Sequence, residues 1–131
     1  MVDKCKAKQF ISEIVGEEHA IPTIGIWDSF EEINFDKLPN QFVLKCNHDS
    51  GSIVICRDKS KLDLSKTKKI IEKSLKRNYF LVHREWPYKN IERKIMCEPL
   101  LHDDGDENSW LVDYKFFCFN GEPKLCYISR D

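Results

Sequence analysis

A lysine between an apolar run and a small polar segment is the first feature of the sequence with a chemical use. Residues 42–44 are Phe, Val and Leu, Lys45 follows, and residues 46–52 are mostly small or polar before a second apolar run at 53–56. A strand would fix the lysine as a point charge, and the loop would present backbone N–H groups where small side chains permit close approach. This pattern suits a flap over the phosphates of a nucleotide, and it suits an ordinary hairpin as well. It is not a P-loop, because no Gly-Lys-Ser/Thr motif opens a helix here.

Glu98 is the second candidate, because it lies at the end of an apolar run and directly before Pro99. A carboxylate at such a strand-to-loop hinge can accept a hydrogen bond from the exocyclic amine of adenine, while the neighbouring backbone bonds the edge of the base. The alternative is a solvated strand end. Glu98 is therefore a candidate for the base end of a nucleotide site.

An acidic segment is the third group with possible chemistry, as a metal site. It contains His102, Asp103, Asp104, Asp106 and Glu107. The spacing misses the calcium-loop pattern, because the glycine and the distal glutamate of that pattern are out of place. We therefore expect a solvated loop and predict no metal ligands. No Ser/His/Asp or Cys/His arrangement has a suitable context, so no catalytic residue is assigned.

Helices and strands must position these candidates, and the periodicity of apolar residues predicts where those elements lie. Strands and helices mix without regular β-α-β alternation, so we expect an α+β fold. The expected helices cover residues 3–15 and 64–79, and the first is capped by Asp3 and closed by Gly16. One helical turn is expected near residues 30–33. The expected strands cover residues 21–27, 41–57 as a hairpin, 93–101, and 110–119 with 124–129 as a second hairpin.

Composition limits the classes of protein. The chain has 131 residues, of which 41% are hydrophobic and 33% charged, as is typical of one globular domain or a piece of a larger one. A net charge of -1 gives no global field for nucleic acid, and no apolar run approaches the roughly 20 residues of a membrane helix. No Cys-x-x-Cys pair suggests zinc, and five cysteines lie in apolar runs, where cysteine acts as a small hydrophobe: Cys46, Cys56, Cys97, Cys118 and Cys126. We therefore expect a reduced, cytoplasmic protein.

Several ordered segments together resemble the TupA-like branch of the ATP-grasp family, which is associated with teichuronopeptide and capsular polysaccharide biosynthesis. The segments span nearly the whole chain and are residues 3–4, 38–39 with 42–51, 84–91, 98–101 and 113–124. The resemblance implies two α+β subdomains that hold ATP between them. It favours the phosphate-flap interpretation of Lys45 over the ordinary hairpin.

The resemblance also implies roles for individual residues. Lys45 and the loop at 48–52 are similar to the strand and flap that contact the phosphates, and Lys4 is similar to an earlier lysine that approaches them. Glu98 and the backbone around Leu100 resemble the hinge that binds adenine. The implied cofactor-binding residues are Lys4, Lys45, His48, Ser50, Gly51, Ser52, Glu98, Leu100 and, as a weaker candidate, Lys115.

The family reaction activates a carboxylate as an acyl phosphate with Mg-ATP, and an amine or a similar nucleophile then displaces the phosphate. We expect the chain to be the N-terminal half of such a ligase-like enzyme, acting in cell-surface polysaccharide biosynthesis on a carboxylate substrate and a sugar polymer. One alternative is a non-catalytic remnant that binds a nucleotide or a partner protein. Another is a glycosyltransferase-associated accessory protein.

The organisation that the resemblance implies is a partial ATP-grasp domain. Residues 1–40 would supply an entry helix and strand, residues 41–101 the nucleotide-flap subdomain, and residues 102–131 the start of the second subdomain. The magnesium ligands of the family lie on later strands, and we expect no counterpart of them in this chain. The edge of the final hairpin is expected to invite self-association.

Overall fold

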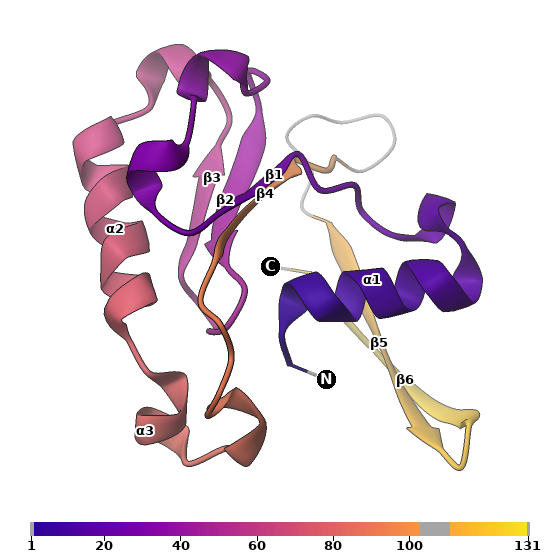
Figure 1. Ribbon diagram of the computed structural model, residues 1–131. Coiled ribbons are helices and arrows are strands. Elements are labelled where there is room, and N and C mark those ends of the chain that lie inside the picture. Colours follow the sequence, from indigo (N-terminus) through magenta and orange to yellow (C-terminus); the bar gives the residue numbers. More distant parts are fainter. Residues whose placement is uncertain (1, 103–110, 131) are drawn as a thin grey trace. The chain divides into compact units, whose positions relative to one another are not determined.

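Four antiparallel strands form the sheet that positions the candidate residues. The computed structural model describes residues 2–102 and 111–130, in two compact units that divide after Leu100. In the first unit the strands stand in the order β1, β4, β2, β3, with the bounds Gly25–Trp27, Ile95–Pro99, Phe42–Cys46 and Ile53–Cys56 (Figure 1). Val43 pairs with Glu98 across β2 and β4. Because side chains alternate along a strand, Val43, Lys45 and Glu98 share one face of the sheet.

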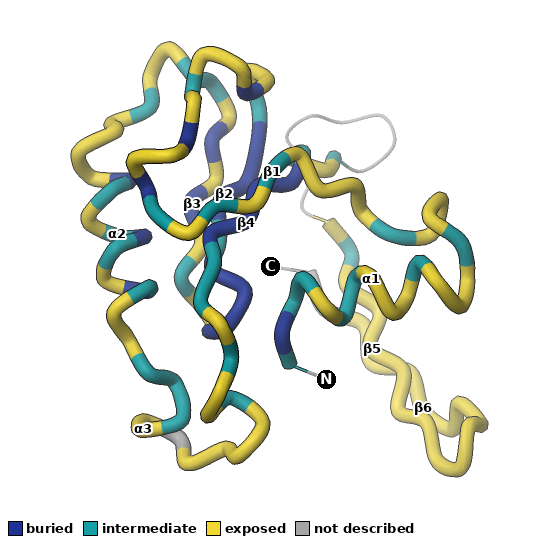
Figure 2. Tube along the Cα trace, viewed as in Figure 1, coloured by how far each residue is buried: buried dark blue, intermediate teal, exposed yellow. Residues whose placement is uncertain are grey.

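The opposite face of the sheet carries the core of this unit. Phe42, Leu44 and Cys97 are fully buried there, in one cluster with Ile71 of helix α2 (Leu64–Lys76). Figure 1 shows α2 lying along the sheet, and Figure 2 shows the buried trace concentrated in β2 and β4. The core therefore fixes these two strands, and through them the positions of Lys45 and Glu98.

Helix α1 (Lys4–Val15) confirms the expected cap and the expected end. The Asp3 carboxylate accepts a hydrogen bond from the backbone N–H of Cys5 at 2.9 Å, and the helix ends at Gly16, whose φ of +100° suits glycine. The apolar stripe of the helix is not buried: no residue of α1 is buried, and Ile14 is 63% exposed. The lysines of α1 attach the helix to the sheet instead.

Short helical turns connect the larger elements. They are η1 (Glu17–His19), η2 (Phe30–Glu32), η3 (Phe35–Lys37), η4 (Lys59–Lys61) and η5 (Trp86–Tyr88). The turn expected near residue 30 is confirmed by η2. The helix expected to reach residue 79 ends at Lys76, and a separate helix α3 (Tyr79–His83) follows. The Asn78 side chain causes this break, because it accepts a hydrogen bond from the backbone N–H of Phe80 and caps the new helix.

The second unit contains a hairpin of β5 (Val112–Phe119) and β6 (Glu122–Arg130). Its two turn residues, Asn120 and Gly121, have φ of 51° and 80°, as a type I′ turn requires, so the expected hairpin is confirmed. Neighbouring side chains on β5 point to opposite faces, and Phe116 and Phe117 are 63% and 51% exposed. The hairpin is therefore exposed on both faces.

The cysteines divide between the two units, and all six are free thiols. Cys46, Cys56 and Cys97 are buried, as expected for small hydrophobic residues. The same expectation for Cys118 and Cys126 is wrong, because both are exposed on the hairpin of the second unit. A strand-like apolar run therefore did not guarantee burial.

The first unit has the α+β character expected from the sequence, with helices and a small antiparallel sheet. Residues 1–40 and 41–101 contribute strands to this single sheet, because β1 pairs with β4. How these segments divide into the subdomains of an ATP-grasp protein stays a prediction. The acidic residues at 103–107 lie outside the described residues. Within the described part of the chain, no helix has the length and apolar character needed to cross a membrane.

Candidate functional site

Lys45, Glu98 and Lys8 form a charge cluster on the face of the sheet opposite the core. The Lys45 ammonium pairs with Oε2 of Glu98, and the Lys8 ammonium lies 2.5 Å from Oε1 of the same carboxylate. Glu98 is only 5% exposed, whereas the side chains of Lys8 and Lys45 are 19% and 23% exposed. The carboxylate is thus held between two cations that come from different elements, α1 and β2.

The two lysines determine the charge of Glu98. Burial raises the pKa of the Glu98 carboxyl, but the hydrogen bonds and charges of Lys45 and Lys8 together lower it by more, so the pKa lies below its ordinary value. Glu98 is therefore ionised at neutral pH. A carboxylate has about four lone-pair positions, so Glu98 can accept a further hydrogen bond while both lysines remain bound.

A pocket of about 350 Å³ opens beside this cluster. Lys4, Lys8, Lys45 and Glu98 supply its charged wall, and Ile11 is among its apolar residues. The structure thus brings together three residues that the sequence singled out separately. Lys8 was not among them, although it lies four residues after Lys4 in a predicted helix and so on the same helix face. That spacing was the signal that could have found it.

Lys4 fixes the start of the loop that follows β2. Its ammonium donates to the backbone carbonyl of Cys46 at 3.1 Å and to that of Asp49, and its backbone N–H donates to the carbonyl of Asn47 at 3.1 Å. Burial lowers the pKa of Lys4, although the charge of Asp49 raises it. Lys4 therefore combines a place on the pocket wall with a structural contact at the base of the loop.

The loop between β2 and β3 presents its small residues to solvent. Ser50 and Gly51 are exposed, and Ser52 is half-buried. Gly51 has φ of +92°, and an added Cβ would meet no atom within 4 Å, so the backbone conformation and not the available space favours glycine. His48 is 2% exposed, and its ring faces α2, so it does not line the pocket with Lys45.

The His48 ring joins the loop to the end of α2. Its Nε2 lies 3.1 Å from the carbonyl oxygen of Ser74 and 3.2 Å from that of Arg77. Carbonyl oxygens only accept, so Nε2 carries the proton and donates. Nδ1 is buried and has no hydrogen-bond partner among the described residues. Burial lowers the pKa of His48, against the raising influence of Asp49 and of the two carbonyls.

Protonation of His48 should therefore destabilise the fold. In the unfolded chain the His48 imidazole binds a proton near pH 6.5, whereas in the folded chain its pKa is lower. The free energy of unfolding should therefore fall as the pH is lowered from about 7 to about 5. We expect His48→Gln, whose amide can still donate to the carbonyls, to lose part of this dependence in urea titrations at both pH values. His19→Gln, at an exposed histidine, is the control and should retain it. An unchanged pH slope in His48→Gln would contradict the prediction.

Asn47 holds three segments together at the end of β2. Its Nδ2 donates to Oδ1 of Asp3 at 3.1 Å and to the carbonyl of Glu92 at 2.9 Å. Its Oδ1 accepts from the backbone N–H of Lys94 at 2.8 Å. The side chain is 1% exposed, so these hydrogen bonds replace all contact with water. Asn47 therefore links the start of α1 to the segment that enters β4, and both carry residues of the pocket.

Leu100 and Lys115 complete the set of residues that the sequence proposed. Leu100 directly follows β4 in the first unit and is half-buried. Lys115 lies on β5 in the second unit, where its ammonium pairs with the carboxylate of Asp113. The structure thus places Leu100 in the same unit as the pocket and Lys115 in the other one.

Near the pocket, the described residues include no candidate for a nucleophilic thiol or for a set of metal ligands. Burial raises the pKa of Cys46 to about 11 and that of Cys97 to about 12, so both thiols stay protonated at neutral pH. Among the residues that the structure describes, no group of three or more His, Cys, Asp or Glu side chains is placed to hold a metal ion.

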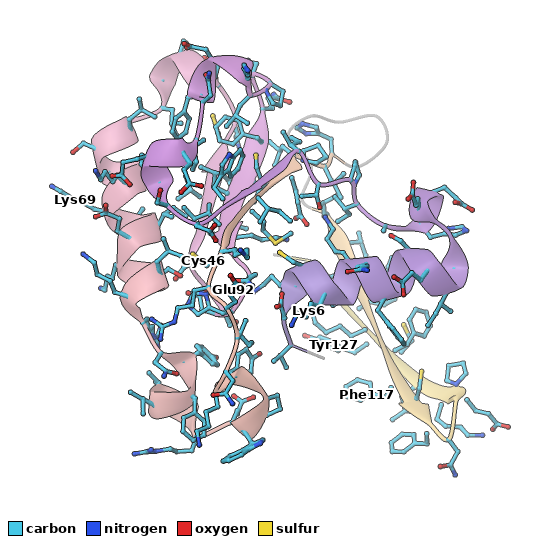
Figure 3. All side chains as sticks on the ribbon, in the orientation of Figure 1. Lys6, Cys46, Lys69, Glu92, Phe117 and Tyr127 are labelled. Atoms are coloured by element: carbon cyan, nitrogen blue, oxygen red, sulfur yellow. The ribbon has the colours of Figure 1, made fainter. Side chains whose placement is uncertain are left out.

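The lysine-rich face of α2 is separate from this cluster. Lys66, Lys69 and Lys73 are exposed, and Lys69 projects from α2 away from the sheet (Figure 3). Lys68, on a neighbouring part of the helix, pairs with Glu31 at 2.5 Å. These lysines therefore offer surface positions for control substitutions.

Comparison with protein-family models adds independent information to this geometry. The model described as TupA-like ATPgrasp matches residues 1–130. No curated protein and no solved structure matches the chain. The match covers nearly every residue, including both units of the structure, and the chain therefore belongs to the TupA-like ATPgrasp family.

Proposed function

We propose that the pocket beside Lys45, Glu98 and Lys8 binds ATP and that the chain contributes this site to an ATP-grasp enzyme. The observation that supports the proposal most directly is the pairing of Lys45 and Glu98 across β2 and β4 at the wall of one pocket. The phosphates of a nucleotide need a fixed cation, and the amine of adenine needs an acceptor. Membership of the family gives independent support.

The residues around the pocket fit the parts of a nucleotide. Ile53 and Ile55 of β3 do not line the pocket, but they lie opposite Lys45 and Val43 and are 49% and 48% exposed, so the same face of the sheet offers apolar surface beside the lysine. In the proposed complex Glu98 accepts a hydrogen bond from the adenine amine. The backbone around Leu100 bonds the edge of the base, as at the hinge of the family.

The loop at 48–52 supplies the remaining groups for the phosphates in this proposal. Its exposed residues Ser50 and Gly51 leave their backbone N–H groups open to an anion, as a flap requires. Lys45 supplies the positive charge, and Lys4 holds the base of the loop through the carbonyls of Cys46 and Asp49. Magnesium would accompany the nucleotide, and its ligands are not assigned to the described residues.

The reaction proposed for the site is the one typical of the family. ATP supplies a phosphoryl group to a carboxylate, which becomes reactive towards an amine or a similar nucleophile. We propose that the carboxylate compound is joined to a sugar polymer of the cell surface. In this scheme the chain's own groups bind and orient the nucleotide, since Lys45 holds the phosphates and Glu98 the base.

Calorimetric titration with Mg-ATP tests the proposal. We expect saturable binding by the unaltered chain, weakened at least about tenfold by Lys45→Ala and by Glu98→Ala, because each removes a hydrogen bond that involves a charged group. Lys69→Ala, on the outer face of α2, is the matched control and should bind as the unaltered chain does. Equal binding by all four proteins would refute the assigned site. A folded chain that gives no heat would refute nucleotide binding by this chain.

A further inference from the structure

We propose that Lys8 is a positioning residue of the nucleotide site: it is the second counter-ion of Glu98, and it allows Lys45 to leave the carboxylate and bind phosphate. This inference rests on the proposed nucleotide-binding function and adds a residue and a step to it. The step involves no covalent change. Lys45 exchanges one anionic partner for another while Glu98 keeps its charge.

The geometry shows that Glu98 engages Lys45. Its ammonium pairs with Oε2 of Glu98, while Lys8 takes Oε1 of the same carboxylate. A phosphate must therefore compete with Glu98 for Lys45, and the outcome depends on what Glu98 loses. The two lysines bind different oxygens, so one can leave without disturbing the other.

Burial makes the second cation necessary. Glu98 is 5% exposed, and a carboxylate in such a position is costly to leave without an ion-pair partner. If Lys45 were its only partner, moving Lys45 to a phosphate would strand the charge of Glu98. Lys8 removes this cost because it remains on Oε1, where it lies 2.5 Å from the oxygen.

Lys8 is itself held in place from outside the strand that carries Lys45. Its ammonium also donates to Oγ1 of Thr23 at 3.1 Å, and the side chain is only 19% exposed. Its helix, α1, is anchored at the base of the loop through the contacts of Lys4. Lys8 can therefore stay with Glu98 while Lys45 moves.

Binding of ATP and of adenosine to Lys8→Met tests this assignment, with calorimetry for ATP and competition for adenosine. We expect the dissociation constant of ATP to rise about tenfold, whereas that of adenosine, which has no phosphate to attract Lys45, should change little. Lys8→Arg should restore most of the ATP affinity, because it supplies the charge again. Lys6→Met, on the same helix (Figure 3), is the matched control, since Lys6 is exposed and forms no ion pair with a described residue.

The same substitution in a Glu98→Gln background separates the possible roles of Lys8. A neutral glutamine needs no counter-ion, so Lys8→Met should then have no further effect on ATP binding. A persistent loss would mean that Lys8 contacts the phosphates directly, and an equal loss of ATP and adenosine would mean a purely structural role; either result overturns the assignment. Unaltered ATP binding by Lys8→Met overturns it too, and leaves the proposed function standing. If the unaltered folded chain binds no nucleotide, the proposed function fails, and this inference fails with it.

Discussion

Replacement of Asn47 by aspartate should lower the free energy of unfolding by about 3–5 kcal/mol, although the two side chains have nearly the same shape. The amide nitrogen that donates to Asp3 and to the carbonyl of Glu92 would become an oxygen facing two acceptors. A new negative charge would lie beside the Asp3 carboxylate in a position that is 1% exposed. Urea denaturation at neutral pH measures the loss. Acidification should reduce it, because a protonated carboxyl regains one donor.

Two further variants keep this prediction testable. Asn90→Asp makes the same chemical change at an exposed asparagine and should change the stability by no more than about 0.5 kcal/mol. If Asn47→Asp is too unstable to purify, Asn47→Ala removes the hydrogen bonds without adding charge and should cost about 2–4 kcal/mol. Stability equal to that of the unaltered protein in both Asn47 variants would show that the amide does not link the segments.

Reversal of the charge at Glu98 is the second substitution with a large expected effect. Glu98→Lys would place three cations where one carboxylate now binds two, and we expect it to lower the free energy of unfolding by about 3–5 kcal/mol. The double substitution Lys45→Glu with Glu98→Lys restores an opposite pair across β2 and β4. It should recover about 1–2 kcal/mol relative to Glu98→Lys alone. Urea denaturation of Lys45→Glu, of Glu98→Lys and of the double variant gives the coupling between the sites.

A surface substitution on the segment before β4 supplies the comparison. Glu92→Lys reverses a charge whose side chain is 76% exposed and pairs with Lys94 at 3.1 Å, so solvent screens the change and stability should hardly move. If Glu98→Lys proves equally harmless, the ion pairs of Glu98 do not stabilise the fold. A double variant whose loss of stability equals the sum of the losses in Lys45→Glu and in Glu98→Lys would show that residues 45 and 98 do not interact.

The elements that could be predicted from the sequence have local signals. Asp3 and Gly16 mark the ends of α1 because capping and a positive φ depend on a few neighbouring residues. The turn at Asn120 and Gly121 is predicted for the same reason. The alternation of side chains along β2 is likewise a local property, and it sets Lys45 on the face opposite the core residue Leu44.

The features that escaped prediction depend on contacts between distant parts of the chain. The Asn47 side chain bonds to residues at least 44 positions away, and no local pattern indicates such partners. The ring of His48 faces α2 because the backbone carbonyls of Ser74 and Arg77 lie there. The sequence of the loop alone does not indicate these partners. The pairing of Lys8 with Glu98 spans 90 positions, and only the folded sheet brings the two together.

The candidate site could be predicted only in part, because its residues have local signals but their contacts do not. Lys45 and Glu98 stood out because each ends an apolar run, and that position is a local property of a strand. Their mutual ion pair is a property of strand order, since β4 is inserted between β1 and β2 although it comes last in the unit. The roles of both residues with a nucleotide stay predictions that the proposed titrations test.

The attachment of α1 has a thermodynamic consequence. The helix buries no residue of its own and is fastened by the ammonium groups of Lys4 and Lys8. Release of α1 from the sheet would break the ion pair between Lys8 and Glu98 and the hydrogen bonds that the Lys4 ammonium donates. The electrostatic part of this cost would decline as ionic strength rises. Added salt should therefore make this helix open more often ahead of the sheet.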